Sequence, residues 1–173
     1  MSDAKHPISA KDAARLMAQV ESDLPAADYI LAQNAEPLTA RPVEGVDLQL
    51  ATAIDHTLLK PDATVAQITT LCQEALDYDF GAICVANVFL PLVRKLLRGP
   101  DGAARCKVVT VVGFPHGNVA TETKVMDTIY CMAQHATDID MVINIGALKS
   151  GRLDAVVGDI SEVVVAAEGV PVK

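Results

Sequence analysis

The chain has 173 residues, and 51% of them are hydrophobic, which is enough apolar material for one ordinary domain. Its 14 Lys and Arg against 22 Asp and Glu give a formal net charge of -8, which argues against sequence-independent binding to nucleic acid or to an anionic membrane. No run approaches the ~18 consecutive apolar residues of a membrane span, and the first residues lack a signal-peptide pattern. We therefore expect a soluble, cytoplasmic protein with a small-molecule role.

The cysteine and histidine spacing gives no sign of a disulfide framework or a metal centre. The cysteines lie far apart, without a Cys-x-x-Cys pair and in apolar or helix-like segments, so we predict reduced thiols with structural roles. They are Cys72, Cys84, Cys106 and Cys131. His6, His116 and His135 lack a spacing to Cys, Asp or Glu that is typical of a metal site, and we predict neither metal nor cofactor.

Residues 1–46 differ in composition from the rest and are predicted to be a partly helical N-terminal extension. A helical pattern runs over Ala10–Val20, with Ser9 as its N-cap, and Pro-punctuated sequence follows as far as Pro42. Residues 47–173 form the second predicted unit. In this unit β-branched runs alternate with helical stretches, which is typical of successive β-α units.

The predicted elements of residues 47–173 follow the chain in strict alternation. The predicted strands are Ile54–Leu58, Ala82–Val85, Lys107–Phe114, Ile139–Ile145 and the start of a fifth at Val170–Lys173. The predicted helices are 64–78, which opens on a Thr64-x-x-Gln67 capping box, Leu90–Leu97, Thr121–His135 and Leu153–Glu168. Strands separated by helices cannot form hairpins, so the sheet should be parallel, with functional residues at the carboxyl ends of the strands.

The fourth predicted strand helps to choose between an open sheet and a barrel. Its alternation puts Asp138, Asp140, Val142 and Asn144 on one face and apolar side chains on the other. An open doubly wound sheet should be apolar on both faces, whereas a barrel can direct polar groups into its lumen. We therefore favour a (β/α) barrel.

Two residues of this sheet could carry chemistry. Asp140 would be a desolvated carboxylate inside the barrel, although Asp138 and Asp140 could instead link neighbouring elements. Lys173 ends an apolar run and could point inward, where a neutral amine can attack a carbonyl to form a Schiff base; the alternative is a solvated lysine at the end of the chain.

Three further segments lie where predicted strands begin or end. In Asp55-His56-Thr57 the alternation separates His56 from the other two, and the triplet alone does not distinguish substrate-orienting groups from structural ones. The run Gly113-Phe114-Pro115-His116-Gly117 describes a shaped turn or an ordinary loop, and Asn144 closes the fourth predicted strand.

The residue identities of three motifs are more informative than their composition or periodicity. The runs IDHTLLKPD from Ile54, VGFPHG from Val112 and IDMVINIGALKSG from Ile139 closely resemble the deoxyribose-phosphate aldolase family, in its order and spacing, from about Ile54 to Lys173. The resemblance implies a class I aldolase on a (β/α)8 TIM barrel. Such an enzyme cleaves 2-deoxy-D-ribose 5-phosphate reversibly to D-glyceraldehyde 3-phosphate and acetaldehyde through a lysine Schiff base, in deoxyribonucleotide breakdown and without metal.

The resemblance also implies roles for single residues. Lys173 matches the Schiff-base lysine and Asp140 the proton-relay aspartate. Asp55, with Thr57 beside it, and Cys84 match positions that support the substrate site, and Asn144 lies in the third matching motif. A homo-oligomer is compatible with the family.

The family pattern continues beyond Lys173 through a second lysine, which lowers the pKa of the first, and glycine-rich phosphate-binding loops. We therefore expect a truncated barrel of four strands and the start of a fifth, which cannot close. Two alternatives remain: a catalytically inactive half-barrel, or another Schiff-base sugar-phosphate aldolase. Two departures lie within the matched region: Ala86-Asn87 replaces a polar residue and proline, and His135-Ala136-Thr137 replaces Gly-Ala-Asp, which removes a helix-ending glycine.

Overall fold

A parallel sheet organises the molecule. The computed structural model describes residues 15, 18–19, 32 and 34–173. Within these residues the sheet order follows the chain order, and all neighbouring strands are parallel. The strands are β1 (Asp55–Leu58), β2 (Ala82–Val85), β3 (Lys107–Val112) and β4 (Asp138–Met141). This order confirms the predicted parallel α/β architecture.

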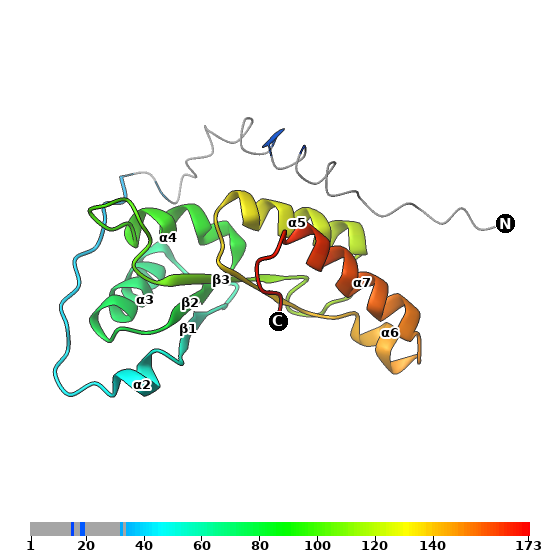
Figure 1. Cartoon of the computed structure of the whole chain (residues 1–173), viewed down its shortest axis with the longest axis horizontal. Coiled ribbons are helices and arrows are strands. Elements are labelled where there is room, and N and C mark those ends of the chain that lie inside the picture. The colour runs from blue at the N-terminus through cyan, green and yellow to red at the C-terminus, as the bar shows by residue number, and fades with distance from the viewer. Residues whose placement is uncertain (1–14, 16–17, 20–31, 33) are drawn as a thin grey trace.

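Helices fill the connections between the strands and extend beyond β4. They are α2 (Leu48–Ala51), α3 (Val65–Asp77), the 3-10 helix η2 (Asn87–Phe89), α4 (Leu90–Leu96), α5 (Thr121–Ala133), α6 (Ile145–Lys149) and α7 (Leu153–Ala166). Figure 1 shows α4 and α5 along one side of the sheet, with α7 beside α5. No described helix is long and apolar enough to cross a membrane.

Helix α3 begins at the predicted capping box. The Thr64 hydroxyl accepts a hydrogen bond from the Gln67 amide at 3.3 Å, and the Thr64 amide donates to Gln67 Oε1 at 2.9 Å. This pairing satisfies two backbone donors that a helix start leaves without partners. The helix then buries four side chains on one stripe, at Ile68, Leu71, Cys72 and Ala75. The stripe fixes the face that α3 presents to the sheet.

The two faces of the sheet carry different residues because side chains alternate along each strand. The helix-covered face belongs to the main core, which joins α3, α4 and α5 to the sheet through Ile83, Val85, Val108, Val112 and Ile139. The opposite face has a smaller apolar cluster formed by Ala82, Cys84 and Val109, with Leu59 and Val111 packed against it. In the strand register, Asp55 and Thr57 share this second face.

Both of the later strands are shorter than predicted. β3 ends at Val112 rather than at Phe114, because Gly113 adopts a left-handed conformation (φ +68°) and turns the chain. β4 ends at Met141 rather than at Ile145, because Asn144 caps helix α6. The polar residue that looked like part of the strand is therefore a helix start.

The ends of α5 and α7 also fall before the predicted residues. α5 ends at Ala133, and His135 follows with φ +59°, in the left-handed region where the family pattern has glycine. α7 ends at Ala166, and Glu168 adopts φ +48°. In both cases a residue other than glycine makes the turn that leaves the helix.

The predicted fifth strand pairs with β4. Val172 forms a parallel bridge to Ile139, and the Lys173 amide donates to the Ile139 carbonyl at 2.8 Å. The Met141 amide in turn donates to the Lys173 carbonyl at 2.8 Å. These bonds place Lys173 directly beside β4.

Part of the predicted extension lies against the helical layer. The Leu38 amide donates to Leu96 O at 2.9 Å, and the Val43 amide donates to Asp77 O at 3.0 Å. Of the helix expected over Ala10–Val20, the structure describes residues 15, 18 and 19, which are helical; the remainder lies outside the described residues. The boundary at residue 46 stays a prediction.

Candidate active site

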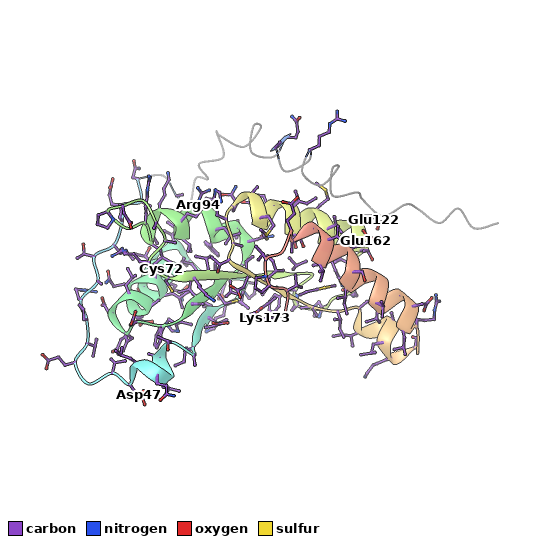
Figure 2. All side chains as sticks on the ribbon, viewed as in Figure 1. Asp47, Cys72, Arg94, Glu122, Glu162 and Lys173 are labelled. Atoms are coloured by element: carbon purple, nitrogen blue, oxygen red, sulfur yellow. The ribbon has the colours of Figure 1, made fainter. Side chains whose placement is uncertain are left out.

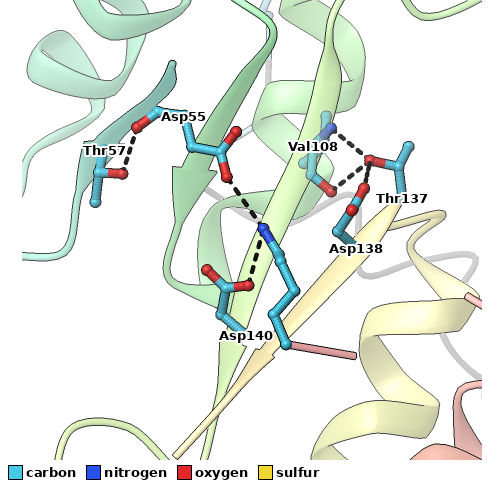
Figure 3. A network of polar contacts seen from close by, with 7 residues as sticks. Asp55, Thr57, Val108, Thr137, Asp138 and Asp140 are labelled. Atoms are coloured by element: carbon cyan, nitrogen blue, oxygen red, sulfur yellow. Dashed lines mark hydrogen bonds and ion pairs between the residues drawn. The ribbon is translucent and has the colours of Figure 1, made fainter. Parts of the chain in front are cut away.

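Three charged side chains from distant parts of the chain meet on the face of the sheet opposite the helices. Lys173 Nζ lies 3.1 Å from Asp55 Oδ2 and 3.1 Å from Asp140 Oδ1. Figure 3 shows the lysine ammonium between the two carboxylates, with dashed lines to both. Asp55 comes from β1 and Asp140 from β4, so the lysine bridges the first and last described strands.

This cluster is accessible to solvent. The side chains of Lys173, Asp55 and Asp140 are 47%, 43% and 37% exposed. Figure 2 shows Lys173 near the middle of the molecule, whereas Arg94 and Glu122 mark the outer helices above it. Asp140 Oδ1 is itself buried, and the Lys173 ammonium is its ion-pair partner. A carboxylate oxygen in contact with the ammonium can accept a proton from it.

Asp55 and Asp140 stabilise the charged form of Lys173. Burial lowers the pKa of Lys173, but the hydrogen bonds and charges of Asp55 and Asp140 outweigh it, so the pKa lies above its ordinary value of 10.5. The resting side chain is therefore an ammonium at neutral pH. Nucleophilic attack on a carbonyl requires the free amine, so a proton must leave Lys173 first.

Cys84 and Thr57 lie in the same region. Cys84 is 3% exposed on β2, and burial followed by the charge of Asp140 raises the pKa of its thiol to about 11. A hydrogen bond with the Thr57 side chain acts in the opposite direction. The Thr57 hydroxyl also donates to the Asp55 carbonyl at 2.8 Å. Cys84 is therefore a neutral thiol at neutral pH.

Two other residues of the polar face are engaged elsewhere. The Asn144 side chain accepts a hydrogen bond from the Ala147 amide at 3.0 Å, which is a capping interaction of α6 rather than a contact with Lys173. Asp138 accepts from the Thr137 hydroxyl at 3.0 Å, and that hydroxyl also accepts from the Val108 amide (Figure 3). Of the two roles considered for Asp138, linking neighbouring elements fits these contacts.

The structure contains a second lysine–carboxylate pair, which our sequence reasoning missed. Lys124 of α5 is 0% exposed, and its Nζ lies 2.5 Å from Asp159 Oδ2 of α7. Both residues occupy the inward stripes of predicted helices, beside Val125 and Val156. A charged residue at an inward position of each of two helices is a signal that could have identified the pair.

The remaining titratable groups show no metal-binding arrangement. Among the residues that the structure describes, no three His, Cys, Asp or Glu side chains come together to hold an ion. The four cysteines, all in the described part of the chain, are buried free thiols, as predicted.

The fold and the site together define a class of protein. Parallel β-α units in chain order, with a lysine between two carboxylates on the face away from the helices, are typical of part of a (β/α)8 barrel with a polar lumen. A model of the DeoC/LacD family aldolases matches residues 49–172. The chain belongs to this family, and the predicted TIM-barrel fold class is confirmed.

Curated relatives and solved structures agree with this assignment. The chain is 46% identical over 121 residues to a deoxyribose-phosphate aldolase of Carboxydothermus hydrogenoformans, covering 70% of this chain and 51% of the relative. It is 49% identical over 120 residues to one of Coprothermobacter proteolyticus, covering 69% and 53%. A tetrameric deoxyribose phosphate aldolase structure from Aeropyrum pernix superposes with a TM-score of 0.61 at 27% identity, covering 92% of this chain and 57% of that one. The chain thus spans about half the length of the curated relatives it matches.

Proposed function

We propose that this chain carries the Schiff-base centre of a deoxyribose-phosphate aldolase. The reaction is the reversible cleavage of 2-deoxy-D-ribose 5-phosphate to D-glyceraldehyde 3-phosphate and acetaldehyde. The observation that supports it most strongly is the placement of Lys173 Nζ at 3.1 Å from each of two carboxylates. The family and the curated relatives supply the substrate class.

In the proposed mechanism the first step removes a proton from the Lys173 ammonium. Asp140 is in contact with Nζ and can take this proton directly or through water. The free amine then attacks the substrate aldehyde to give a carbinolamine. Loss of water, with a proton returned to the departing hydroxyl, gives the protonated imine.

Cleavage of the carbon–carbon bond follows from the electron demand of that imine. Removal of the proton from the C3 hydroxyl lets the C2–C3 bonding electrons move into the iminium, which releases D-glyceraldehyde 3-phosphate and leaves an enamine. Protonation of the enamine carbon and hydrolysis release acetaldehyde and restore Lys173. In this scheme Asp140 relays protons, whereas Asp55, Thr57 and Cys84 shape and support the site.

One observation favours a second candidate function, in which the chain is not catalytic by itself. The charges around Lys173 raise its pKa, whereas an imine-forming lysine is favoured by a lowered pKa. A further cation near Lys173 would lower it, and no described contact supplies one. On this alternative the chain is an inactive half-barrel. A third candidate is a Schiff-base aldolase for another sugar phosphate, which activity measured against deoxyribose and ketose phosphates would distinguish.

Chemical trapping tests the proposal directly. The purified chain is incubated with acetaldehyde and borohydride, and reduced ethyl adducts are located by mass spectrometry. We expect the adduct on Lys173 to exceed those on Lys60, Lys107 and Lys149, which serve as internal controls. Equal labelling of all four lysines would reject the Schiff-base role and favour the inactive half-barrel.

The assembly of the chain is a separate proposal. The Aeropyrum pernix relative is described as tetrameric. We propose a homo-oligomer for this chain as well, and multi-angle light scattering measures it: a monomeric mass at micromolar concentration would contradict the proposal.

A further inference from the structure

The buried pair Lys124–Asp159 joins α5, α7 and the segment that follows β4. Lys124 Nζ, on α5, donates to Asp159 Oδ2 of α7 at 2.5 Å and to the Val142 carbonyl at 2.9 Å. The other Asp159 oxygen accepts from the Thr121 hydroxyl at 2.9 Å. Lys124 is fully buried and Asp159 is 4% exposed, so both charges are isolated from water.

Stability alone is a weak reason for such a pair. Transferring two charges from water into the interior costs several kcal/mol per ion, and apolar residues of the same size are often as stabilising or more so. The contact with Val142 suggests another reason. Lys124 holds a backbone carbonyl immediately beyond the end of β4, where the chain leaves the sheet.

The held carbonyl belongs to the segment that carries Asp140. Val142 lies two residues beyond Asp140, and its amide donates to the Val112 carbonyl of β3 at 2.9 Å. Val142 is thus bonded on both sides, by β3 through its amide and by Lys124 through its carbonyl. These two bonds fix the end of β4 next to the carboxylate that contacts Lys173.

The turn after β3 packs against the same two places. A Cβ on Gly113 would lie 2.9 Å from Lys124 Cε, so the absence of a side chain there lets the lysine pass. A Cβ on Gly117 would lie 1.9 Å from the Ile143 carbonyl oxygen. The turn is closed by a hydrogen bond from the Gly117 amide to the Gly113 carbonyl at 2.8 Å. The Gly113–Gly117 turn and residues 142–143 therefore pack against each other and against Lys124; we call the turn and residues 142–143 the rim.

We propose that Lys124 and Asp159 are positioning residues: they hold the rim at the carboxyl ends of β3 and β4 and thereby orient Asp140 toward Lys173. The structural half of this inference stands by itself. The kinetic half rests on the proposed function of Lys173.

The double variant K124M/D159L tests the structural half. Methionine and leucine approximate the shapes of the lost side chains without leaving a buried charge, so the fold should survive. Hydrogen exchange of the Val142 and Gly117 amides should accelerate on the order of tenfold, while the β2 amides keep their wild-type rates. The control is R152M/D154L, which removes an exposed pair joined at 3.1 Å and should leave both rim amides unchanged. Wild-type exchange of the rim amides in the double variant would overturn the proposal.

A milder variant covers the case in which the double variant does not fold. T121V removes only the hydroxyl that donates to Asp159 Oδ1. We expect the same two amides to exchange about twofold to fivefold faster, with the melting temperature nearly unchanged. Wild-type exchange rates of the Val142 and Gly117 amides in T121V would contradict the proposal that the buried pair holds the rim.

Trapping with acetaldehyde and borohydride tests the kinetic half. In K124M/D159L the Lys173 adduct should form about tenfold more slowly when both proteins are compared at the same fraction of free amine. Lys173 faces Asp55 of β1, Cys84 of β2 and Asp140 of β4. In the double variant Asp140 should contribute less to the raised pKa of Lys173, so the pH profile of adduct formation should move to lower pH. A purely structural role would leave the profile in place.

The two failures are distinguishable. If the wild-type chain forms no adduct on Lys173, the proposed function fails, and the exchange rates still decide whether the pair holds the rim. If the rim amides exchange faster in K124M/D159L and adduct formation keeps its wild-type rate and pH profile, the positioning role is overturned.

Discussion

The molecule contains two lysine–aspartate clusters whose environments are opposite. Lys173 lies between Asp55 and Asp140 on an accessible face, at 3.1 Å from each, and its side chain is 47% exposed. Lys124 contacts Asp159 at 2.5 Å and is completely buried between α5 and α7. The same functional groups can therefore do chemistry in one place and fix backbone in the other. Access to solvent distinguishes the first cluster from the second.

Removal of the exposed lysine, Lys173, should have the largest effect. K173M should abolish the site-specific acetaldehyde adduct, because Lys173 is the lysine that contacts both Asp55 and Asp140. Its melting temperature should change by no more than about 2–4 °C, since exposed ion pairs contribute about 0–1 kcal/mol. K149M is the matched control, and mass spectrometry with thermal unfolding gives both readouts. An adduct of wild-type yield elsewhere in K173M would remove the distinction between the clusters.

Removal of the buried lysine should have the opposite signature. K124M leaves the Asp159 carboxylate buried without its partner, which typically costs about 3–5 kcal/mol in the free energy of unfolding. Urea denaturation of K124M against K149M measures this difference. A loss below about 1 kcal/mol would mean that the second pair is no more important to stability than a surface pair.

The two carboxylates around Lys173 should differ from each other. D140N removes the group assigned to proton relay, and we expect the rate of adduct formation to fall by about 10²–10⁴-fold, as for a lost general base. D55N should not slow adduct formation to this extent, because Asp55 stabilises the ammonium without relaying protons, and its loss leaves more free amine at a given pH. D62N, at an exposed loop position, is the control. Equal effects of D55N and D140N would reject the assignment of separate roles.

The smallest expected effect is in the pH dependence. Adduct formation by the wild-type chain should increase with pH as Lys173 deprotonates, with its midpoint above 10.5 because Asp55 and Asp140 raise the pKa. D55N should shift this midpoint to lower pH, since one of the two carboxylates no longer stabilises the ammonium. The corresponding contribution of Lys173 to folding is present below the pKa of the unfolded chain and is lost as the pH rises through the higher folded value. A D55N midpoint above that of the wild-type chain would show that these contacts do not set the charge of Lys173.

Particular residues show how far the sequence could be interpreted. The Thr64-x-x-Gln67 pair predicted the start of α3 correctly because a capping box is a local interaction. The alternation of Asp138 and Asp140 indicated a polar face, and the structure places Asp140 there with Lys173. The predicted end of β4 was wrong, because apolar spacing does not distinguish a strand from the start of a helix that Asn144 caps.

The sequence by itself determined the elements, their parallel order and the residue types that could form a Schiff-base site, since these depend on periodicity, caps and motifs within short segments. Only the tertiary structure decided which charges meet. It brings Asp55 and Lys173 together across 118 positions of the chain. It also shows that Lys124 is buried against Asp159 rather than exposed. The physical reason is that burial and Coulomb interactions depend on distances between elements, and spacing along a helix or strand contains no such distance.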